Sequence, residues 1–326
     1  MDLFVSREFD QFVETFSGLH GHYILRTAQV RDWRLRTMDL SGVTLMLGAE
    51  GAGRVFDGRA ADGWFHIFMV LGNGYGVTVN GVEFDSGTVA WIAPKKTFLT
   101  SSDKPSRWLN IAISAELVLR WAAEHQDEFD ARLLDENFVR RISPSPLSLI
   151  SLVRRLYRVN KCHPAQLHTP EAKQAARTEI LDALFGLLLP IARGPNPYRR
   201  GANRMKLLNC ALRFLELRHE EAVRTEDLCA ATGVSERTLR NVFHNYLGMS
   251  PHRYLMVRRL HAIRSGIRQA APEDTITRIC ARFGVWDFGR FSQQYRLFFG
   301  ELPSRSLYSA KGSMRQKAIP SVVDAP

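Results

Sequence analysis

The sequence predicts an α+β protein of two domains: a β-barrel-like N-terminal domain that also carries helices, and an all-α C-terminal domain with two helix-turn-helix units. Three observations lead to this prediction. Short apolar runs alternate with glycine-bearing turns early in the chain, a segment rich in proline, glycine and arginine interrupts the later helical pattern, and two similar helical segments follow it. A length of 326 residues suits two domains, because one hydrophobic core usually serves ~100 to 200 residues.

The short apolar runs are typical of β-strands. They lie at residues 43–47, 64–71, 75–79, 88–92 and 108–113. The clearest signal is the Asn80-Gly81 pair, because asparagine and glycine supply the positive backbone angles that a two-residue hairpin turn requires. Large residues such as Trp64, Phe68 and Trp91 could line a cavity in this domain, or they could form the filled core of a small barrel.

Helical periodicity flanks the predicted strands. One helix is expected before them, with Phe9, Phe12, Val13 and Phe16 on one face. Three longer helices are expected after them, at residues 115–127, 147–159 and 171–191. Residues 193–201 then fit neither period, which is typical of a linker. The predicted divisions are an N-terminal domain at 1–192, a linker at 193–202, a C-terminal domain at 203–310 and a disordered tail at 311–326.

The net charge of +11 belongs to the second domain. Residues 1–198 hold 22 basic and 22 acidic side chains, whereas residues 199–326 hold 22 basic and 11 acidic ones, a difference of 11. A concentrated positive field beside a neutral domain favours a polyanionic partner, because cationic side chains release counterions from a phosphate backbone. An acidic membrane surface would also attract such a domain, and the bland alternative is a basic, soluble surface.

The sequence gives little support for a membrane-spanning segment, a metal site or a catalytic site. No apolar run is long enough to cross a membrane and the first residues do not resemble a secretory signal, so we expect a cytoplasmic protein without a membrane partner. The cysteines lack zinc or disulfide spacing: Cys162, Cys210, Cys229 and Cys280. His20 and His22 form the only pair of histidines two apart, at an expected turn with no carboxylate close behind, and His66 is expected to be packed or to line a pocket. We therefore predict no metal, no cofactor and no catalytic residue.

An internal repeat in the second domain is the decisive feature. When residues 225–251 are laid on residues 275–303, four pairs coincide at offsets of 51, 51, 52 and 52: Cys229 with Cys280, Gly233 with Gly284, Gly248 with Gly300, and Pro251 with Pro303. The small cysteine lets two helices approach, and the glycine turns the chain where other residues would be strained. Ser235 and Asp287 can cap the helix that follows in each copy.

The outward stripes of these helices carry the residue types that read base edges in the major groove. Arginine pairs with guanine, and asparagine or glutamine pairs with adenine. The predicted DNA-binding residues are Ser235, Arg237, Arg240, Asn241, His244, Arg290, Gln293, Gln294 and Arg296. The alternative is an ordinary solvated helix face, which the presence of two copies on a basic domain disfavours. Phe288 is expected in the core, and Trp286 could cover the turn.

At these residues the chain resembles the AraC/XylS family of bacterial transcription regulators. The resemblance covers roughly residues 205–308 and rests on the pattern Ala281-x-x-Gly284-Val285-x-Asp287-x-Gly289-x-Phe291, followed by Tyr295, Phe299, Gly300 and Pro303. The family usually has phenylalanine at position 285, serine at 289 and phenylalanine at 295, so these departures predict a second recognition helix that docks less firmly or reads fewer bases. The stretch from Val285 to Phe291 and the N-terminal pattern are most similar to the branch of the ethanolamine-operon regulator.

The resemblance implies a cupin-like effector and dimerisation domain followed by a domain that binds promoter DNA. It further implies a transcriptional activator with RNA polymerase as a partner, a small-molecule effector of unknown identity and a homodimer. Two alternatives stay open at this point. One is an architectural DNA binder whose first domain dimerises without sensing, and the other is a barrel enzyme fused to a DNA-binding module.

The helix between the two copies predicts their spacing. Residues 251–268 start with proline, which is favoured in a first helical turn, and carry apolar residues at Met256, Leu260, Ile263 and Ile267. At ~1.5 Å per residue such a helix is about 27 Å long. With the radii of the flanking units, the two recognition helices would then lie about one DNA turn, ~34 Å, apart.

Overall fold

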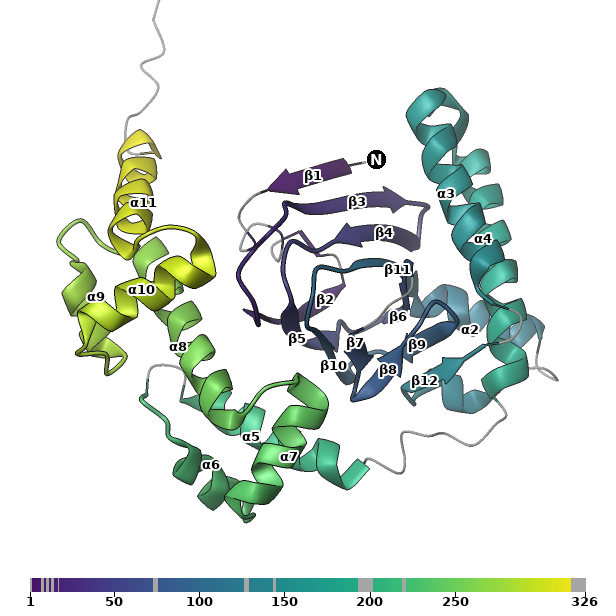
Figure 1. The fold of residues 1–326 in the computed structure, drawn as a ribbon. Helices are drawn as coiled ribbons and strands as arrows, with labels where there is room; N and C mark the ends of the chain where they lie inside the picture. Colours follow the sequence, from purple (N-terminus) through teal and green to yellow (C-terminus); the bar gives the residue numbers. More distant parts are fainter. Residues whose placement is uncertain are drawn as a thin grey trace, which may run out of the picture. The chain divides into compact units, whose positions relative to one another are not determined.

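The computed structural model describes residues 2–6, 9, 12, 15–16, 18–72, 76–125, 129–142, 145–192, 202–218 and 221–317. These residues form two compact units, an N-terminal unit made mostly of residues 1–203 and a C-terminal unit made mostly of residues 204–326 (Figure 1). Most of the expected linker, residues 193–201, lies outside the described residues, so the exact boundaries of the domains stay a prediction.

The N-terminal unit is built on two antiparallel sheets. The seven-stranded sheet has the order β1-β3-β4-β11-β6-β9-β12 and the five-stranded sheet the order β2-β5-β10-β7-β8. The strands are β1 (Asp2–Ser6), β2 (Leu19–Leu25), β3 (Trp33–Asp39), β4 (Val43–Ala49), β5 (Arg54–Ala60), β6 (Trp64–Val70), β7 (Val77–Val79), β8 (Val82–Phe84), β9 (Thr88–Ile92), β10 (Thr97–Ser102), β11 (Arg107–Ser114) and β12 (Phe138–Arg141). Each predicted strand is present, although the one expected at 75–79 begins at Val77. The predicted hairpin turn is confirmed by positive φ angles of 49° at Asn80 and 76° at Gly81.

A helical layer covers one face of the larger sheet (Figure 1). It consists of α2 (Ala115–Glu124), α3 (Leu147–Cys162) and α4 (Pro170–Ala192), with short 3-10 turns at Ala131–Leu134 and Pro164–Leu167. Alternate residues of β11, among them Leu109 and Ile111, join the core under these helices. Trp91 belongs to the same core, where its Nε1 donates to the Leu133 carbonyl at 2.8 Å. This tryptophan is therefore filled core and does not line a cavity. Of the helix expected before the strands, Phe9 and Phe12 are helical and buried, Val13 lies outside the described residues, and Phe16 is not helical.

Buried polar groups lie elsewhere in the N-terminal unit. The Glu50 carboxylate is 2% exposed and accepts hydrogen bonds from Tyr23, Arg54, Ser106 and Trp108 at 2.5 to 3.1 Å. His66 is also buried. Its Nε2 lies 2.8 Å from the Gly18 carbonyl and its Nδ1 lies 3.1 Å from the Asn110 amide nitrogen.

Burial lowers the pKa of His66 to about 4, so this histidine is neutral and packed, as one of the two sequence interpretations held. His20 and His22 lie in β2 and not at a turn, because their strand pairs along its whole length with β5. Among the described residues, no group of three His, Cys, Asp or Glu side chains is arranged to hold a metal ion.

The C-terminal unit is all-helical in its described residues. Its helices are α5 (Ala202–Leu217), α6 (Thr225–Thr232), α7 (Glu236–Leu247), α8 (Pro251–Arg268), α9 (Ile276–Arg282), α10 (Phe288–Phe299) and α11 (Pro303–Lys317). The expectation of a disordered tail from residue 311 is wrong for its first part, because α11 continues to Lys317. The Lys311 ammonium links α11 to the segment before α9, because it donates to the carbonyls of Pro272 and Asp274 at 2.5 and 2.8 Å. Residues 318–326 lie outside the described residues. No helix in the described part of the chain is long and apolar enough to span a membrane.

Candidate nucleic-acid interface

The first helix-turn-helix unit consists of α6, a tight turn and α7. Gly233 adopts φ 69° and donates its amide hydrogen to the Cys229 carbonyl at 2.9 Å, which closes α6 and turns the chain. The Ser235 hydroxyl then accepts from the Thr238 amide at 3.4 Å, a long contact at the predicted cap position. The inward face of α7 is buried as expected, with Leu239 and Phe243 at 0% exposure.

The second unit repeats this construction with α9 and α10. Gly284 adopts φ 66°, and the amide of Val285 donates to the Cys280 carbonyl at 3.0 Å. Asp287 caps α10 by accepting from the Arg290 amide at 3.0 Å, a shorter bond than its counterpart in the first unit. The glycines that end α7 and α10, Gly248 and Gly300, also have positive φ. All four glycines of the sequence repeat thus occupy backbone conformations that favour glycine.

The two predicted stripes face solvent. Eight of the nine predicted DNA-binding residues are exposed: Ser235, Arg237, Arg240, Asn241, His244, Arg290, Gln293 and Arg296, while Gln294 is half-buried. On α7 the Arg240 guanidinium forms an ion pair with Glu236, one helical turn earlier, at 2.6 Å. Both side chains are more than half exposed, so this pair contributes little to stability and can open. On α10 the stripe is interrupted by Gly289, which has no side chain to offer.

Helix α8 joins the two units and spans the 18 residues predicted from the sequence. Its first turn is capped by Ser250, whose hydroxyl accepts from the Arg253 amide at 3.3 Å. Near this end, Tyr254 packs edge-on against Phe243 of α7 with ring centroids 5.6 Å apart. Near the other end, Leu260, Ile263 and Ile267 share a core with α9 and α10. Because each unit is packed onto α8, the helix acts as a rigid spacer between them.

A polar network fixes the second unit to α8. Arg264 is 6% exposed, and its Nη1 lies 3.3 Å from the Glu301 carboxylate and 3.4 Å from the Tyr295 hydroxyl. Ser306 links the other partners, because its hydroxyl lies 2.8 Å from that of Tyr295 and donates to Glu301 at 2.6 Å. The guanidinium also lies 4.6 Å from the centre of the Phe299 ring. Tyr295 therefore makes polar contacts that a phenylalanine could not make, which argues against looser docking at this position.

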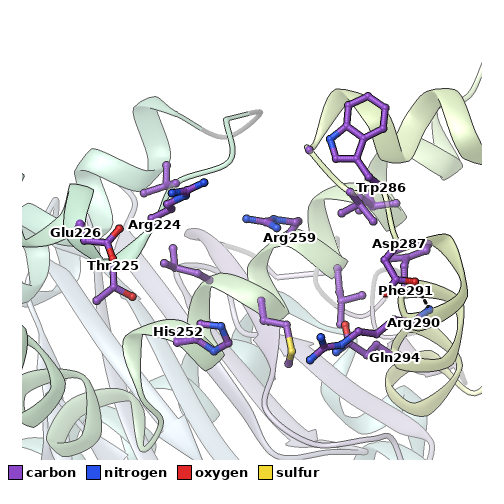
Figure 2. Close-up of a pocket in the computed structure, with 17 residues that line it drawn as sticks. Arg224, Thr225, Glu226, His252, Arg259, Trp286, Asp287, Arg290, Phe291 and Gln294 are labelled. Carbon is purple, nitrogen blue, oxygen red and sulfur yellow. Dashed lines mark hydrogen bonds between the residues drawn. The ribbon is translucent and has the colours of Figure 1, made fainter.

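A groove of about 520 Å³ follows α8 between the start of α6 and the start of α10 (Figure 2). We call it the α8 groove. Its polar lining comes from three regions of the chain: Arg224, Thr225, Glu226, His252, Arg259, Trp286, Asp287, Arg290 and Gln294. Trp286 is 73% exposed at its rim, so this indole leaves most of its surface open to a partner.

Of the residues in the α8 groove, Arg290 and Gln294 were predicted from the sequence, whereas Arg224, His252 and Arg259 were not. Arg259 is half-buried on α8, and this burial lowers the pKa of its guanidinium. Burial of a charged group is unfavourable unless an opposite charge compensates it. The apolar spacing around Arg259 predicts a helix, but it does not show that the polar face of this helix lines a groove.

Comparison with known proteins finds a family match that includes both helix-turn-helix units. Residues 228–307 match the family model described as a helix-turn-helix domain. A "XylDLEGF operon transcriptional activator" of Pseudomonas putida is 34% identical over 101 residues, which cover 31% of this chain and 32% of that protein. A "Probable thc operon regulatory protein" of Rhodococcus erythropolis is 30% identical over 151 residues, covering 44% of this chain and 45% of that protein.

Among solved structures, a transcriptional regulator from Chromobacterium violaceum with an AraC-type DNA-binding domain is 29% identical, with a TM-score of 0.31. That alignment covers 33% of this chain and 96% of the solved chain. The chain spans about a third to a half of the length of the curated relatives just described. Residues 228–307 thus match a helix-turn-helix domain, and the curated relatives just described are named as an operon activator and an operon regulatory protein.

Proposed function

We propose that this chain is a sequence-specific DNA-binding transcription regulator and that it activates transcription. The observation that carries this proposal is the pair of helix-turn-helix units fixed to the two ends of one 18-residue helix, each with an exposed polar stripe. The basic charge of the chain is concentrated around them. The similarity of residues 228–307 to helix-turn-helix domains supports the DNA-binding role, and the relative named as an activator supports the direction of regulation.

In the proposed complex, α7 and α10 enter successive major grooves on one face of the duplex. Arg240 and Asn241 contact base edges in the first groove, and Arg290 and Gln293 do so in the second. Ser235, Arg237, His244, Gln294 and Arg296 complete the interface at the edges of these contacts. Arg240 releases Glu236 when it binds a base, at a cost of about 0.3 to 0.5 kcal/mol, because the pair is exposed.

The test compares specific and non-specific binding. The wild-type chain first selects its operator from random-sequence duplexes, and the affinity of each variant is then measured for that operator and for a scrambled duplex. Arg240→Ala and Asn241→Ala are expected to weaken operator binding by about 1 to 3 kcal/mol and to leave scrambled binding nearly unchanged. Arg213→Ala, which removes an exposed charge on α5, is the control. An equal loss on both duplexes would mean that these residues contact phosphates and not bases.

We further propose that the N-terminal unit, which carries the two sheets, senses a small organic anion. A cavity of about 830 Å³ is lined by the cationic side chains of Arg31, Arg34 and Arg107 and by apolar side chains that include Val70 and Leu71. All three arginines are exposed, and Asp32 is the acidic residue beside them, while Glu50 is already paired with Arg54. This mixture of cationic and apolar lining suits a short-chain carboxylate.

Thermal unfolding of the full chain tests the anion proposal. Hexanoate is expected to raise the melting temperature, neutral hexanol to leave it unchanged, and Arg34→Ala to abolish the effect of hexanoate. An equal response to both compounds, or an unchanged response of the variant, would contradict an anion site here. Without any ligand response, the chain would fit the alternative of an architectural DNA binder.

The partners of the whole protein are also proposals. Dimerisation through the N-terminal unit and contact with RNA polymerase follow from the resemblance to AraC/XylS regulators. The nearer similarity to the ethanolamine-operon branch is part of the same proposal. We propose no catalytic role and a cytoplasmic site of action. Sedimentation of the full chain with and without operator would show whether it binds as a dimer.

A further inference from the structure

We propose that the α8 groove binds the DNA sugar-phosphate backbone where it passes between the two major grooves, with Arg259 of the joining helix as its central phosphate contact. This inference rests on the proposed DNA-binding function and extends it to a segment that so far served only as a spacer. Arg224 would contact the same backbone from one side of the groove, with His252 beside it, while Arg290, proposed above to contact a base edge, lines the other side (Figure 2).

Positive charge from separate elements converges on the α8 groove. Arg224 precedes α6, Arg259 and His252 lie on α8, and Arg290 lies in the first turn of α10, yet all four line one groove. Two carboxylates line it as well. That of Asp287 accepts the Arg290 amide at the helix start, and that of Glu226 is exposed. The three arginines therefore outnumber the carboxylates even when His252 is neutral.

The charge of Arg259 is not compensated by an ion pair within the described part of the chain. Its side chain is half-buried, and burial lowers the pKa of its guanidinium. Among the described residues, neither Glu226 nor Asp287 of the same groove forms an ion pair with it. Other arginines of this unit differ, since Arg264 has Glu301 at 3.3 Å and Arg240 has Glu236 at 2.6 Å. A half-buried guanidinium without an anion is suited to an anion that arrives with the partner.

The position of the α8 groove also favours a contact with the backbone. The α8 groove includes Arg290 and Gln294 of the second recognition helix and reaches the start of α6 in the first unit. When both recognition helices lie in successive major grooves of one duplex, the DNA backbone must pass the helix between them. This follows because adjacent major grooves are separated by a minor groove and its two phosphate strands. The part of the groove around Arg259 therefore lies where phosphates are expected.

A phosphate contact has a distinct signature, because it neutralises charge without reading sequence. We expect Arg259→Ala to lower affinity for the operator and for a scrambled duplex by the same factor, about tenfold. The slope of log affinity against log salt concentration should become shallower by about 1. Arg259→Lys should restore most of that slope, because it keeps the charge.

Two controls keep the experiment interpretable. Arg213→Ala removes the same charge from α5, outside the groove, and should leave the slope unchanged. Melting curves of the variants should match the wild type, and Arg259→Gln replaces Arg259→Ala if the alanine variant is less stable. The proposal is overturned if the slope does not change, or if only operator binding weakens, because the groove would then be empty of backbone or would act through base reading. Failure of the wild type to prefer its operator over scrambled DNA would instead contradict the proposed function.

Discussion

The two helix-turn-helix units share one construction and differ in how they are held and what they display. The first unit shows four polar side chains along α7, but its cap at Ser235 is long and its Arg240 is paired with Glu236. The second has a tighter cap at Asp287 and a buried network around Arg264, but its stripe is broken at Gly289. We infer that the first unit contributes more to reading sequence, and that the second is the more firmly anchored.

The largest effect is expected from breaking the anchor of the second unit. Glu301→Ala leaves the buried guanidinium of Arg264 without its carboxylate, and should destabilise the second unit by about 2 to 3 kcal/mol. Hydrogen exchange of the full chain can resolve this, because amides of α10 should exchange faster while those of α7 change less. The matched control is Glu236→Ala, which removes an exposed partner of an arginine in the first unit. Equal effects in both helices would contradict the difference in anchoring.

The next effect concerns how much each unit reads. Asn241→Ala should weaken operator binding by about 1 to 3 kcal/mol, whereas Gln293→Ala should cost less, because Gly289 leaves the second stripe with fewer neighbouring contacts. Operators scrambled in one half separate the two contributions. A greater loss from Gln293→Ala would reverse the ranking of the two units.

The smallest expected effect would sharpen the account of Arg240. Glu236→Gln removes the ion pair at 2.6 Å and one negative charge near the DNA. Operator affinity should therefore rise about twofold, in line with ~0.3 to 0.5 kcal/mol for an exposed helical pair. Titration at low and high salt checks the result, because the gain should shrink as salt screens the charges. A loss of affinity would assign Glu236 a direct role in binding.

The helices of the C-terminal unit could be predicted well from the sequence because their signals are local. Ser250 and Pro251 mark the start of α8, and the glycine turns and apolar spacing around it need no distant partner. Several strands of the N-terminal unit were not predicted, because their signals depend on distant partners. Strand β5 carries the charged Arg54, which reads as a surface residue until folding brings Glu50 against it.

The candidate site shows the same division. The stripes on α7 and α10 follow from helical spacing within one segment, and the exposure of Arg240 and Asn241 agrees with it. The α8 groove could not be found this way. Arg224, Arg259 and Arg290 are separated by more than thirty residues in sequence, and only the packing of both units onto α8 brings them to one surface.

The central claim is that two reading units held by a rigid helix contact one face of the duplex about one turn apart. Footprinting of the full chain on operators with inserted base pairs tests this most directly. We expect two short protected segments per chain, centred ~34 Å apart, and loss of joint protection when about five base pairs are inserted, because one segment then faces the far side of the duplex. An insertion of about ten pairs should also fail, since α8 is packed at both ends and cannot lengthen. Unchanged affinity after the five-pair insertion would contradict the claim and leave a single unit to do the binding.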